Sequence, residues 1–132
     1  MQEITIRTQQ HCQFINIDAQ VQSAVDAARI QNGICCIFVP HTTAGITINE
    51  NADPDVVRDI IATLDKLVPW HGNYAHTEGN SAAHVKASML GFCQTVLVRE
   101  GKLALGTWQS IYFCEFDGPR TRKIWITVIP AP

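Results

Sequence analysis

The sequence predicts an α+β fold, a β-sandwich-like arrangement with two or three helices packed on the sheets. Short apolar or alternating runs, which are typical of strands, outnumber the helical patterns and occur near both ends of the chain. Hydrophobic residues make up 46% of the chain, which is enough to build a packed core. With 132 residues and no internal repeat, the chain is expected to form one domain over residues 1–132.

The first part of the chain shows three strand patterns and one helix pattern. Residues 4–6 alternate and predict a half-buried strand, and residues 14–17 predict a second strand. Asp18 is expected to be the N-cap of the helix that follows. Residues 34–39 are continuously apolar and predict a strand covered on both faces. The buried face of the helix is expected to contain Val21, Ala24, Val25 and Ala28.

The middle of the chain predicts a strand, two helices and a loop. Residues 45–51 alternate and predict the strand. A helix is expected from residue 53 onward, because Asp-Pro-Asp supplies an N-cap, a proline for the first helical position and an acid near the positive end of the dipole. Residues 70–79 lack periodicity and predict a loop, whereas residues 80–90 predict a short helix.

The last part of the chain predicts a strand over residues 95–98 and then a β-hairpin. The hairpin is expected to turn at residues 117–120, because this Asp-Gly-Pro-Arg sequence is rich in turn-forming residues. Asp117 and Arg120 are an acid and a base that a surface turn does not need, and Gln109 lies near the start of the first strand. Since the arginine fork suits phosphate and carboxylate, the turn is a candidate anion site.

Composition and charge argue against several classes of function. The net charge of −2 and the absence of a Lys/Arg cluster disfavour nucleic-acid binding. There is neither a signal-peptide pattern nor an apolar run long enough to span a membrane, so we expect no membrane association. The five cysteines include no CxxC pair, which disfavours a disulfide framework and a zinc ribbon and indicates a reducing cytoplasm.

A first polar group follows the buried strand, at residues 41–45. His41, Thr42, Thr43 and the glycine after them offer side-chain and backbone donors that suit a phosphate group. The alternative is an ordinary strand connection, with threonine present for its β propensity.

A second polar group ends the alternating strand, at residues 49–51. Glu50 has the same parity as the apolar Ile46 and Ile48, which predicts that it points toward the interior end of the strand. A buried carboxylate needs a partner or a proton, so Glu50 is a candidate base or metal ligand, with Asn49 beside it. The following acids, Asp53 and Asp55, are explained by helix capping.

A third polar group spans the loop and the short helix. Asn80, His84 and Ser88 recur every four residues and share one helix face. His76 and His84 with a carboxylate are candidate ligands of a divalent metal, although no spacing here is a metal-binding motif. His11 and His71 are interpreted as surface residues. Taken together, these groups predict a polar pocket made of His41, Glu50, Asn80, His84, Gln109, Asp117 and Arg120.

Three long stretches resemble the YjbQ family, also described as the secondary thiamine-phosphate synthase family. They read HTTAGITINENADPDV at residues 41–56, HTEGNSAAHVKASMLG at residues 76–91 and GKLALGTWQSIYFCEFDGPRTR at residues 101–122. The resemblance implies the YjbQ fold, a homotrimer with pockets near the subunit interfaces, and a weak thiamine-phosphate synthase activity. That transferase reaction joins hydroxymethylpyrimidine diphosphate to thiazole phosphate and releases pyrophosphate.

Roles for individual residues follow from this reaction and from residue type. Arg120 with Thr42 and Thr43 would hold phosphate, His41 or His84 would protonate the leaving diphosphate, and Glu50 or Asp117 would hold Mg²⁺. Further substrate contacts are expected from Asn49, Asn80, Ser88 and Gln109. No organic cofactor is expected.

Two other classes of function stay open at this point. The first is a non-catalytic homotrimer that binds a ligand or a metal such as Zn²⁺, held by His76, His84 and Glu50. The second is a hydrolase or lyase that acts on another phosphorylated metabolite.

Overall fold

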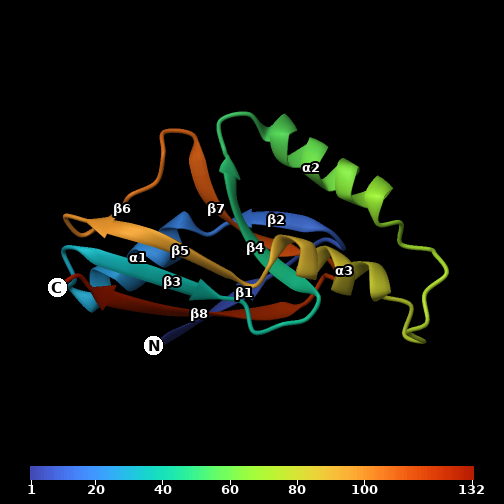
Figure 1. The fold of residues 1–132 in the computed structure, drawn as a ribbon, viewed down its shortest axis with the longest axis horizontal. Coiled ribbons are helices and arrows are strands. Elements are labelled where there is room, and N and C mark those ends of the chain that lie inside the picture. The colour runs from blue at the N-terminus through green and yellow to red at the C-terminus, as the bar shows by residue number, and fades with distance from the viewer.

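Two antiparallel sheets pack face to face in the computed structural model, which describes residues 1–132 (Figure 1). The five-stranded sheet has the order β1 (Gln2–Arg7), β8 (Thr121–Pro130), β3 (Gly33–Phe38), β5 (Cys93–Arg99) and β6 (Lys102–Leu103). The three-stranded sheet has the order β2 (Gln13–Asn16), β7 (Gln109–Glu115) and β4 (Ala44–Glu50). The two-residue strand β6 is the one strand that the sequence pattern did not indicate.

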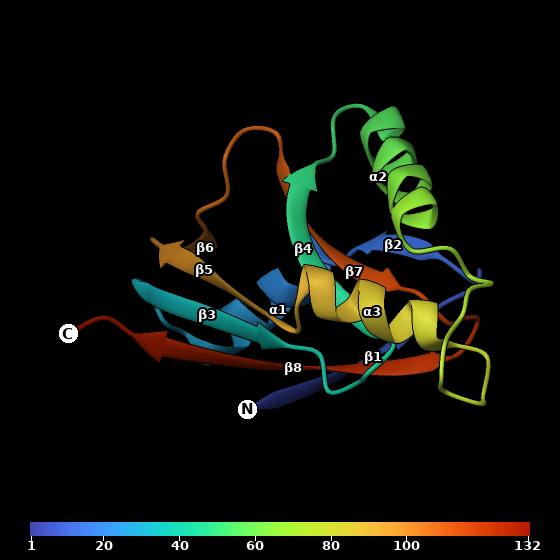
Figure 2. The same ribbon diagram turned by 45° about the vertical axis from the view of Figure 1, so that its right-hand side comes forward.

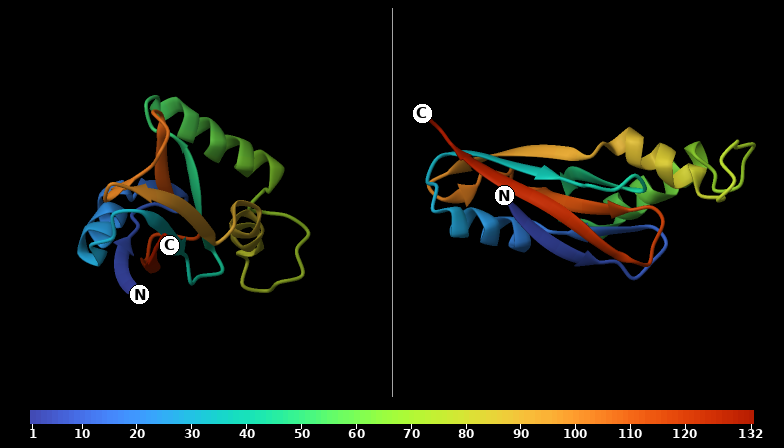
Figure 3. Two further views of the ribbon diagram at one scale, coloured as in Figure 1. Left: turned by 60° about the vertical axis from the view of Figure 1, so that its left-hand side comes forward. Right: turned by 90° about the horizontal axis from the view of Figure 1, so that it is seen from below.

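Three helices pack on this sandwich: α1 (Asp18–Ala28), α2 (Pro54–Leu67) and α3 (Ser81–Leu90). Figures 1 and 2 show α3 lying across the start of β4, while α2 stands on the side where β4 ends. In Figure 3 the long α2–α3 connection loops away from the sheets. The predicted α+β fold with helices packed on a sandwich is confirmed. None of the three helices has the length and apolar character needed to cross a membrane.

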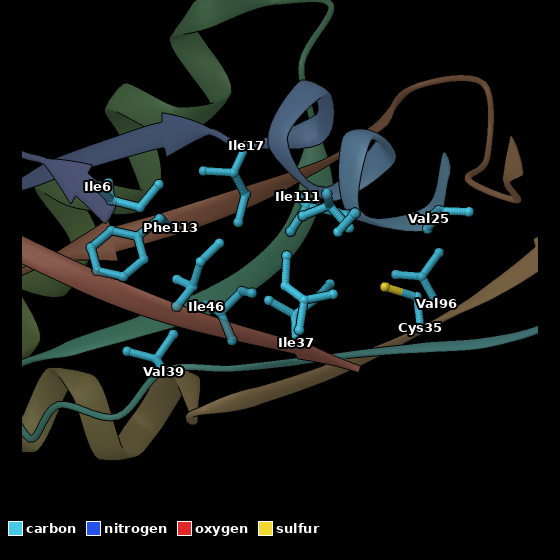
Figure 4. Close-up of a cluster of buried hydrophobic side chains, with 14 of the residues drawn as sticks. Ile6, Ile17, Val25, Cys35, Ile37, Val39, Ile46, Val96, Ile111 and Phe113 are labelled. Atoms are coloured by element: carbon cyan, nitrogen blue, oxygen red, sulfur yellow. The ribbon is translucent and has the colours of Figure 1, made fainter. Parts of the chain in front are cut away.

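The main core lies between the two sheets and beneath α1 (Figure 4). Ile37 and Val96 come from the five-stranded sheet, and Ile46 and Phe113 come from the three-stranded sheet; all four are at most 4% exposed. Each such side chain contributes roughly 1.5–3 kcal/mol by leaving water. The inward-facing residues of β3 and β4 therefore pack against each other. The prediction that the strand over residues 34–39 is covered on both faces was wrong, because Phe38 on its outer face is 42% exposed.

The two predicted helix starts have different outcomes. At α2 the carboxylate of Asp53 accepts a hydrogen bond from the N–H of Asp55 at 2.9 Å, so this N-cap is confirmed. At α1 the N-cap is Ile17 and the prediction for Asp18 was wrong. Asp18 is the first helical residue instead, and its carboxylate accepts the N–H of Ile111 at 2.7 Å. This bond ties α1 to β7.

The predicted C-terminal hairpin was also wrong. β7 pairs with β2 and β4, whereas β8 pairs with β1 and β3, so the chain crosses from one sheet to the other between them. Both strands already have a neighbour on each side. Gly118 is needed at the crossing because of a close approach: a Cβ there would lie 2.3 Å from the carbonyl oxygen of Gln10 and 2.9 Å from Oγ1 of Thr8.

Candidate functional site

A polar pocket of about 450 Å³ lies where three connections meet, at one end of the sandwich. These are the β3–β4 connection, the residues leading into α3, and the β7–β8 crossing. Figure 2 shows all three on the same side of the molecule. The lining residues are almost all polar: Pro40, His41, Thr42, Thr43, His76, Glu78, Asn80, His84, Arg120 and Arg122.

Arg122 on β8, which lines the pocket, forms a buried ion pair with Glu115 on β7. Their side chains are 3% and 0% exposed. Arg122 donates through Nε to Oε1 of Glu115 at 2.8 Å and through Nη2 to Oε2. Nη2 also donates to Oγ1 of Thr43 at 2.8 Å. The pair therefore links the two sheets to the first loop of the pocket.

Further donors fix the charge of Glu115. Its carboxylate accepts the hydroxyl of Thr8 at 2.8 Å and the N–H of Asp117 at 3.0 Å. Burial alone would raise the pKa of Glu115, but the hydrogen bonds from Arg122, Asp117 and Thr8 outweigh burial and lower that pKa. Glu115 is thus ionised, and it holds Arg122 in one orientation.

A second pair lies at the rim of the pocket. Arg120 donates through Nε to the carbonyl of Asp117 at 2.9 Å and through Nη2 to its Oδ2 at 3.1 Å. Asn80 donates to the same Oδ2 at 2.9 Å. This leaves Oδ1 of Asn80 buried without a hydrogen-bond partner, which is costly unless a ligand, ion or water supplies one.

His41 has a defined tautomer. Its Nε2 accepts the backbone N–H of Lys123 at 2.8 Å, so the ring proton of the neutral form lies on Nδ1. Burial and then the positive charge of Arg122 lower the pKa of His41. His41 is accordingly a neutral hydrogen-bond donor, and a less suitable acid for protonating a leaving group.

His84 and His76 also line the pocket and contact each other. Their rings meet edge to face with centroids 5.4 Å apart. Nε2 of His76 lies 3.9 Å from a carboxylate oxygen of Glu78. Nowhere in the structure do three or more His, Cys, Asp or Glu side chains gather in a way that would hold a metal.

A family model described as "UPF0047 protein YjbQ-like" matches residues 2–131. The chain belongs to this family. It is 49% identical to UPF0047 protein MJ1081 of Methanocaldococcus jannaschii over 94% of this chain and 90% of the relative. It is 48% identical to UPF0047 protein YugU of Bacillus subtilis over 98% of both chains.

Solved structures of the YjbQ family have the same fold. A Clostridium acetobutylicum member, solved at 1.31 Å as an uncharacterised conserved protein, superposes with a TM-score of 0.96 at 54% identity, over 98% of this chain and 100% of that one. The conserved hypothetical protein TT1486 of Thermus thermophilus gives 0.92 at 38% identity over the same shares. The predicted family is therefore confirmed, while these names assign no activity.

Most of the sequence-predicted site residues of this YjbQ-family chain come together. Three separate stretches supply them, as the sequence suggested. Asp117 does not line this pocket but bonds to two of the residues that do. The predicted residues that line the pocket are His41, Thr42, Thr43, His76, Asn80, His84 and Arg120.

Four predicted residues lie elsewhere. Glu50 pairs with Gln109 at the far end of β4, six residues from Ala44 and thus about 20 Å along the strand. Glu50 therefore cannot complete a metal site with His76 and His84. Nor is it fully buried: Ile46 on the same side of β4 is buried, whereas Ile48 and Glu50 are only half-buried. The side-chain oxygen of Gln109 accepts a hydrogen bond from the N–H of Gly106 and lies outside the pocket.

The remaining two of these four residues, Asn49 and Ser88, also make local contacts. Asn49 accepts the N–H of Glu50 at 2.7 Å, and the hydroxyl of Ser88 donates to the carbonyl of His84 at 2.9 Å. Ser88 shares a helix face with His84 but lies one turn farther from the pocket. A common helix face with His84 did not suffice to predict Ser88 as a pocket residue, because the pocket reaches only the first turn of α3.

Sequence reasoning missed the buried pair itself. Arg122 has the same strand parity as the apolar Ile124 and Ile126, which both face the core. Glu115 is the last residue of β7 and directly follows the apolar residues 111–114. A charged residue at an inward position in each strand was the available signal, since buried charges need partners.

Proposed function

We propose that this YjbQ-family protein is a weak thiamine-phosphate synthase that binds the phosphates of its substrates in the polar pocket. The observation that carries the proposal is the set of unused donors there. Nη1 of Arg120 and Nη1 of Arg122 make no hydrogen bond with the protein, and neither does Nδ1 of His41. With the hydroxyl of Thr42, these groups suit phosphate oxygens.

The reaction needs these groups for positioning and charge stabilisation. When the carbon–oxygen bond of the pyrimidine diphosphate breaks, its electrons go to the diphosphate and leave a cationic methylene. The ring nitrogen of thiazole phosphate then attacks that methylene and forms the new carbon–nitrogen bond. The two guanidinium groups and the Nδ1–H of His41 stabilise the charge that develops on the diphosphate.

His84 is the better candidate for proton donation to the leaving diphosphate. Burial and the charge of Arg122 lower the pKa of His41 and favour its neutral form, and its Nε2 already accepts the N–H of Lys123. No protein group bonds to the ring nitrogens of His84. A general acid of this kind contributes about 10²–10⁴-fold in rate.

Mg²⁺ suits the acceptor side of the pocket better than Zn²⁺. Mg²⁺ binds through one or two protein oxygens together with substrate phosphates. Oδ1 of Asp117 and the orphaned Oδ1 of Asn80 are such oxygens. When bound, Mg²⁺ would supply positive charge to the diphosphate. Zn²⁺ would need a third protein ligand beside His76 and His84, and there is none with Glu50 at the far end of β4.

The same charges explain why the activity would be weak. Arg122 is neutralised by Glu115, and Arg120 is paired with Asp117. A pocket that binds two phosphorylated substrates would be more efficient with more uncompensated cations. We therefore expect slow turnover.

Calorimetric titration with thiazole phosphate tests phosphate binding in this pocket. Arg120→Ala is expected to weaken binding roughly tenfold, since an arginine–phosphate contact is a charged hydrogen bond. Lys123→Ala is the matched control, because it removes one positive charge whose partners are Thr5 and Glu3, outside the pocket. Equal binding by all three proteins would contradict the proposal.

A homotrimer is part of this proposal, and the outer face of the five-stranded sheet supports it. Leu97 and Ile129 flank Ile34 on that face and are 59% and 46% exposed. Phe38 stacks on Trp125 on the same face, four residues along β3 from Ile34, with centroids 5.8 Å apart. Exposed apolar patches of this kind are typical of subunit interfaces. A subunit bound here would lie near the pocket, because Phe38 is three residues before His41.

Light scattering during size-exclusion chromatography tests the oligomer. Leu97→Glu is expected to give monomers, whereas Leu67→Glu, which changes an exposed leucine on α2, is expected to leave the trimer intact. A monomeric wild-type protein would contradict this part of the proposal.

The rival function is a non-catalytic trimer that binds a metal or another ligand. Metal analysis of protein purified without a nickel column distinguishes the two: stoichiometric zinc that survives dialysis against a chelator would favour the rival. A panel of phosphatase and lyase substrates addresses the remaining alternative.

We also propose a cytoplasmic location, with which the five free cysteines are consistent.

A further inference from the structure

A second and larger pocket, of about 800 Å³, adjoins the first. Its lining residues are Gln10, His11, Cys12, Asp65, Trp70, Lys86 and Asp117. We propose that this pocket binds the nitrogen-containing ring of the phosphorylated pyrimidine substrate, while the first pocket binds its phosphates. This inference rests on the proposed function and names where the organic part of the substrate lies.

Lys86 is the first reason to expect a ligand in this pocket. Its side chain is only 3% exposed, and its ammonium forms an ion pair with Asp65 and lies 6.0 Å from the ring centroid of Phe116. An ammonium group has three N–H donors, and the protein uses one of them. A buried lysine that lines a pocket with donors to spare is suited to a hydrogen-bond acceptor such as a ring nitrogen.

An aromatic wall is the second reason. The rings of His11 and Trp70 meet edge to face with centroids 4.3 Å apart, and both line the pocket. Aromatic side chains bind flat rings through stacking and edge contacts. Asp65 and Asp117 add carboxylate oxygens, which accept hydrogen bonds from amino groups. A ring with both an acceptor nitrogen and an amino group matches this combination, and aminopyrimidines have both.

The two pockets are placed for one ligand to occupy both. Asp117 lines the second pocket, and its Oδ2 accepts hydrogen bonds from Arg120 and Asn80 of the first. Helix α3 also serves both, with His84 in the first pocket and Lys86 in the second. The negative charge of Asp117 is offset by Arg120, so the boundary between the pockets does not exclude a phosphate ester.

The thiol of Cys12 points to binding in the second pocket rather than covalent chemistry. Burial raises the pKa of Cys12, and the nearest ring nitrogen of His11 lies 3.8 Å from its sulfur. A thiol with a raised pKa is a poor nucleophile at neutral pH. The second pocket therefore has the features of a recognition site, and the bond-making groups belong to the substrates.

The test uses nitrogen-15 NMR of the indole N–H groups, because the chain has three tryptophans. Unphosphorylated hydroxymethylpyrimidine is the probe for the second pocket and inorganic phosphate is the probe for the first. The pyrimidine is expected to shift the Trp70 signal and to leave the signals of Trp108 and Trp125 in place. Trp125 donates its indole N–H to Glu3 on the outer face of the sheet and serves as an internal control.

Variants complete the test. Trp70→Leu and Asp65→Asn are expected to weaken binding of the free pyrimidine by roughly tenfold and to leave phosphate binding unchanged. Arg120→Ala is expected to weaken phosphate binding and to leave binding of the free pyrimidine unchanged. Hydroxymethylpyrimidine phosphate, which would occupy both pockets, is expected to bind more weakly to all three variants. Asp65 is 55% exposed, so Asp65→Asn keeps the shape of the site, but it removes the ion-pair partner of the buried Lys86. Thermal unfolding of both variants therefore shows that the fold is retained before binding is compared.

Two results would overturn the inference. One is binding of phosphate in the first pocket with no shift of Trp70 in the wild type on adding the pyrimidine. The other is an affinity for the pyrimidine, measured by calorimetric titration, that Trp70→Leu and Asp65→Asn leave unchanged. Both would leave the proposed phosphate pocket standing. Failure of phosphate itself to bind would count against the proposed function instead, so the two failures are distinguishable.

Discussion

Arg122, which lines the candidate phosphate pocket, forms an ion pair with Glu115 across the gap between the two sheets. The pair is formed where β7 ends and β8 begins, on either side of the crossing that replaces the predicted hairpin. Glu115 orients the guanidinium, and Thr43 connects it to the β3–β4 loop. The same contacts thus position one wall of the pocket and join the sheets.

We predict that Arg122→Ala lowers the free energy of unfolding by about 3–5 kcal/mol, because it leaves Glu115 buried without its cation. Arg120→Ala is the matched control and is expected to cost at most about 1 kcal/mol, since the Arg120 side chain is 48% exposed in its ion pair with Asp117. Urea denaturation measures both. Equal losses in the two variants would show that Arg122 has no special structural role.

We predict that His41 makes the protein less stable as the pH falls. Its pKa is lowered on folding from an ordinary value of 6.5, so the unfolded chain binds the proton more readily. The contribution of neutral His41 to stability is complete above pH 6.5, and it is lost as the pH falls toward the pKa of His41 in the folded protein. Between about pH 7 and about pH 5, wild type should lose more stability than His41→Asn. If the free energy of unfolding falls equally with pH in the two proteins, this account is contradicted.

We predict that Gly118→Ala destabilises the protein by about 1–3 kcal/mol or more, because the new methyl group would overlap the Gln10 carbonyl. Gly106→Ala is the control. There the nearest atom to the new methyl group is 3.1 Å away and belongs to the flexible side chain of Gln109. Thermal unfolding compares the two, and a similar melting temperature for both would refute the close-approach explanation.

We predict that His84→Ala reduces synthase turnover by about 10²–10⁴-fold while the fold and the trimer are retained. Ser88→Ala, one turn along the same helix and outside the pocket, should retain full activity. Turnover and light scattering are measured on the same preparations. Dissociation of His84→Ala into monomers would make His84 an interface residue instead.

The sequence predicted the local elements better than their pairing. Alternation identified β1 and β4, and the Asp-Pro-Asp signal located the start of α2, because these features depend on neighbours in sequence. The hairpin prediction failed because a turn signal such as that at Gly118 does not say whether the chain returns to the same sheet. Only the full strand order shows that β7 has no free edge for β8.

The candidate site was predicted in part for the same reason. Residues that follow strands or precede a helix, such as His41 and Asn80, were identified by local pattern and do line one pocket. Glu50 was misjudged, because parity gives a face of the strand but not its burial at the far end. Lys86 and Trp70 carry no local signal, since only tertiary packing brings them to a common pocket.

The most direct test of the central claim is formation of thiamine phosphate from hydroxymethylpyrimidine diphosphate and thiazole phosphate in the presence of Mg²⁺. The wild type and Lys123→Ala are expected to form product, and Arg120→Ala and His41→Ala are expected to lose most of it. No product from the wild type, or product that neither pocket variant reduces, would contradict the assignment of synthase chemistry to this pocket.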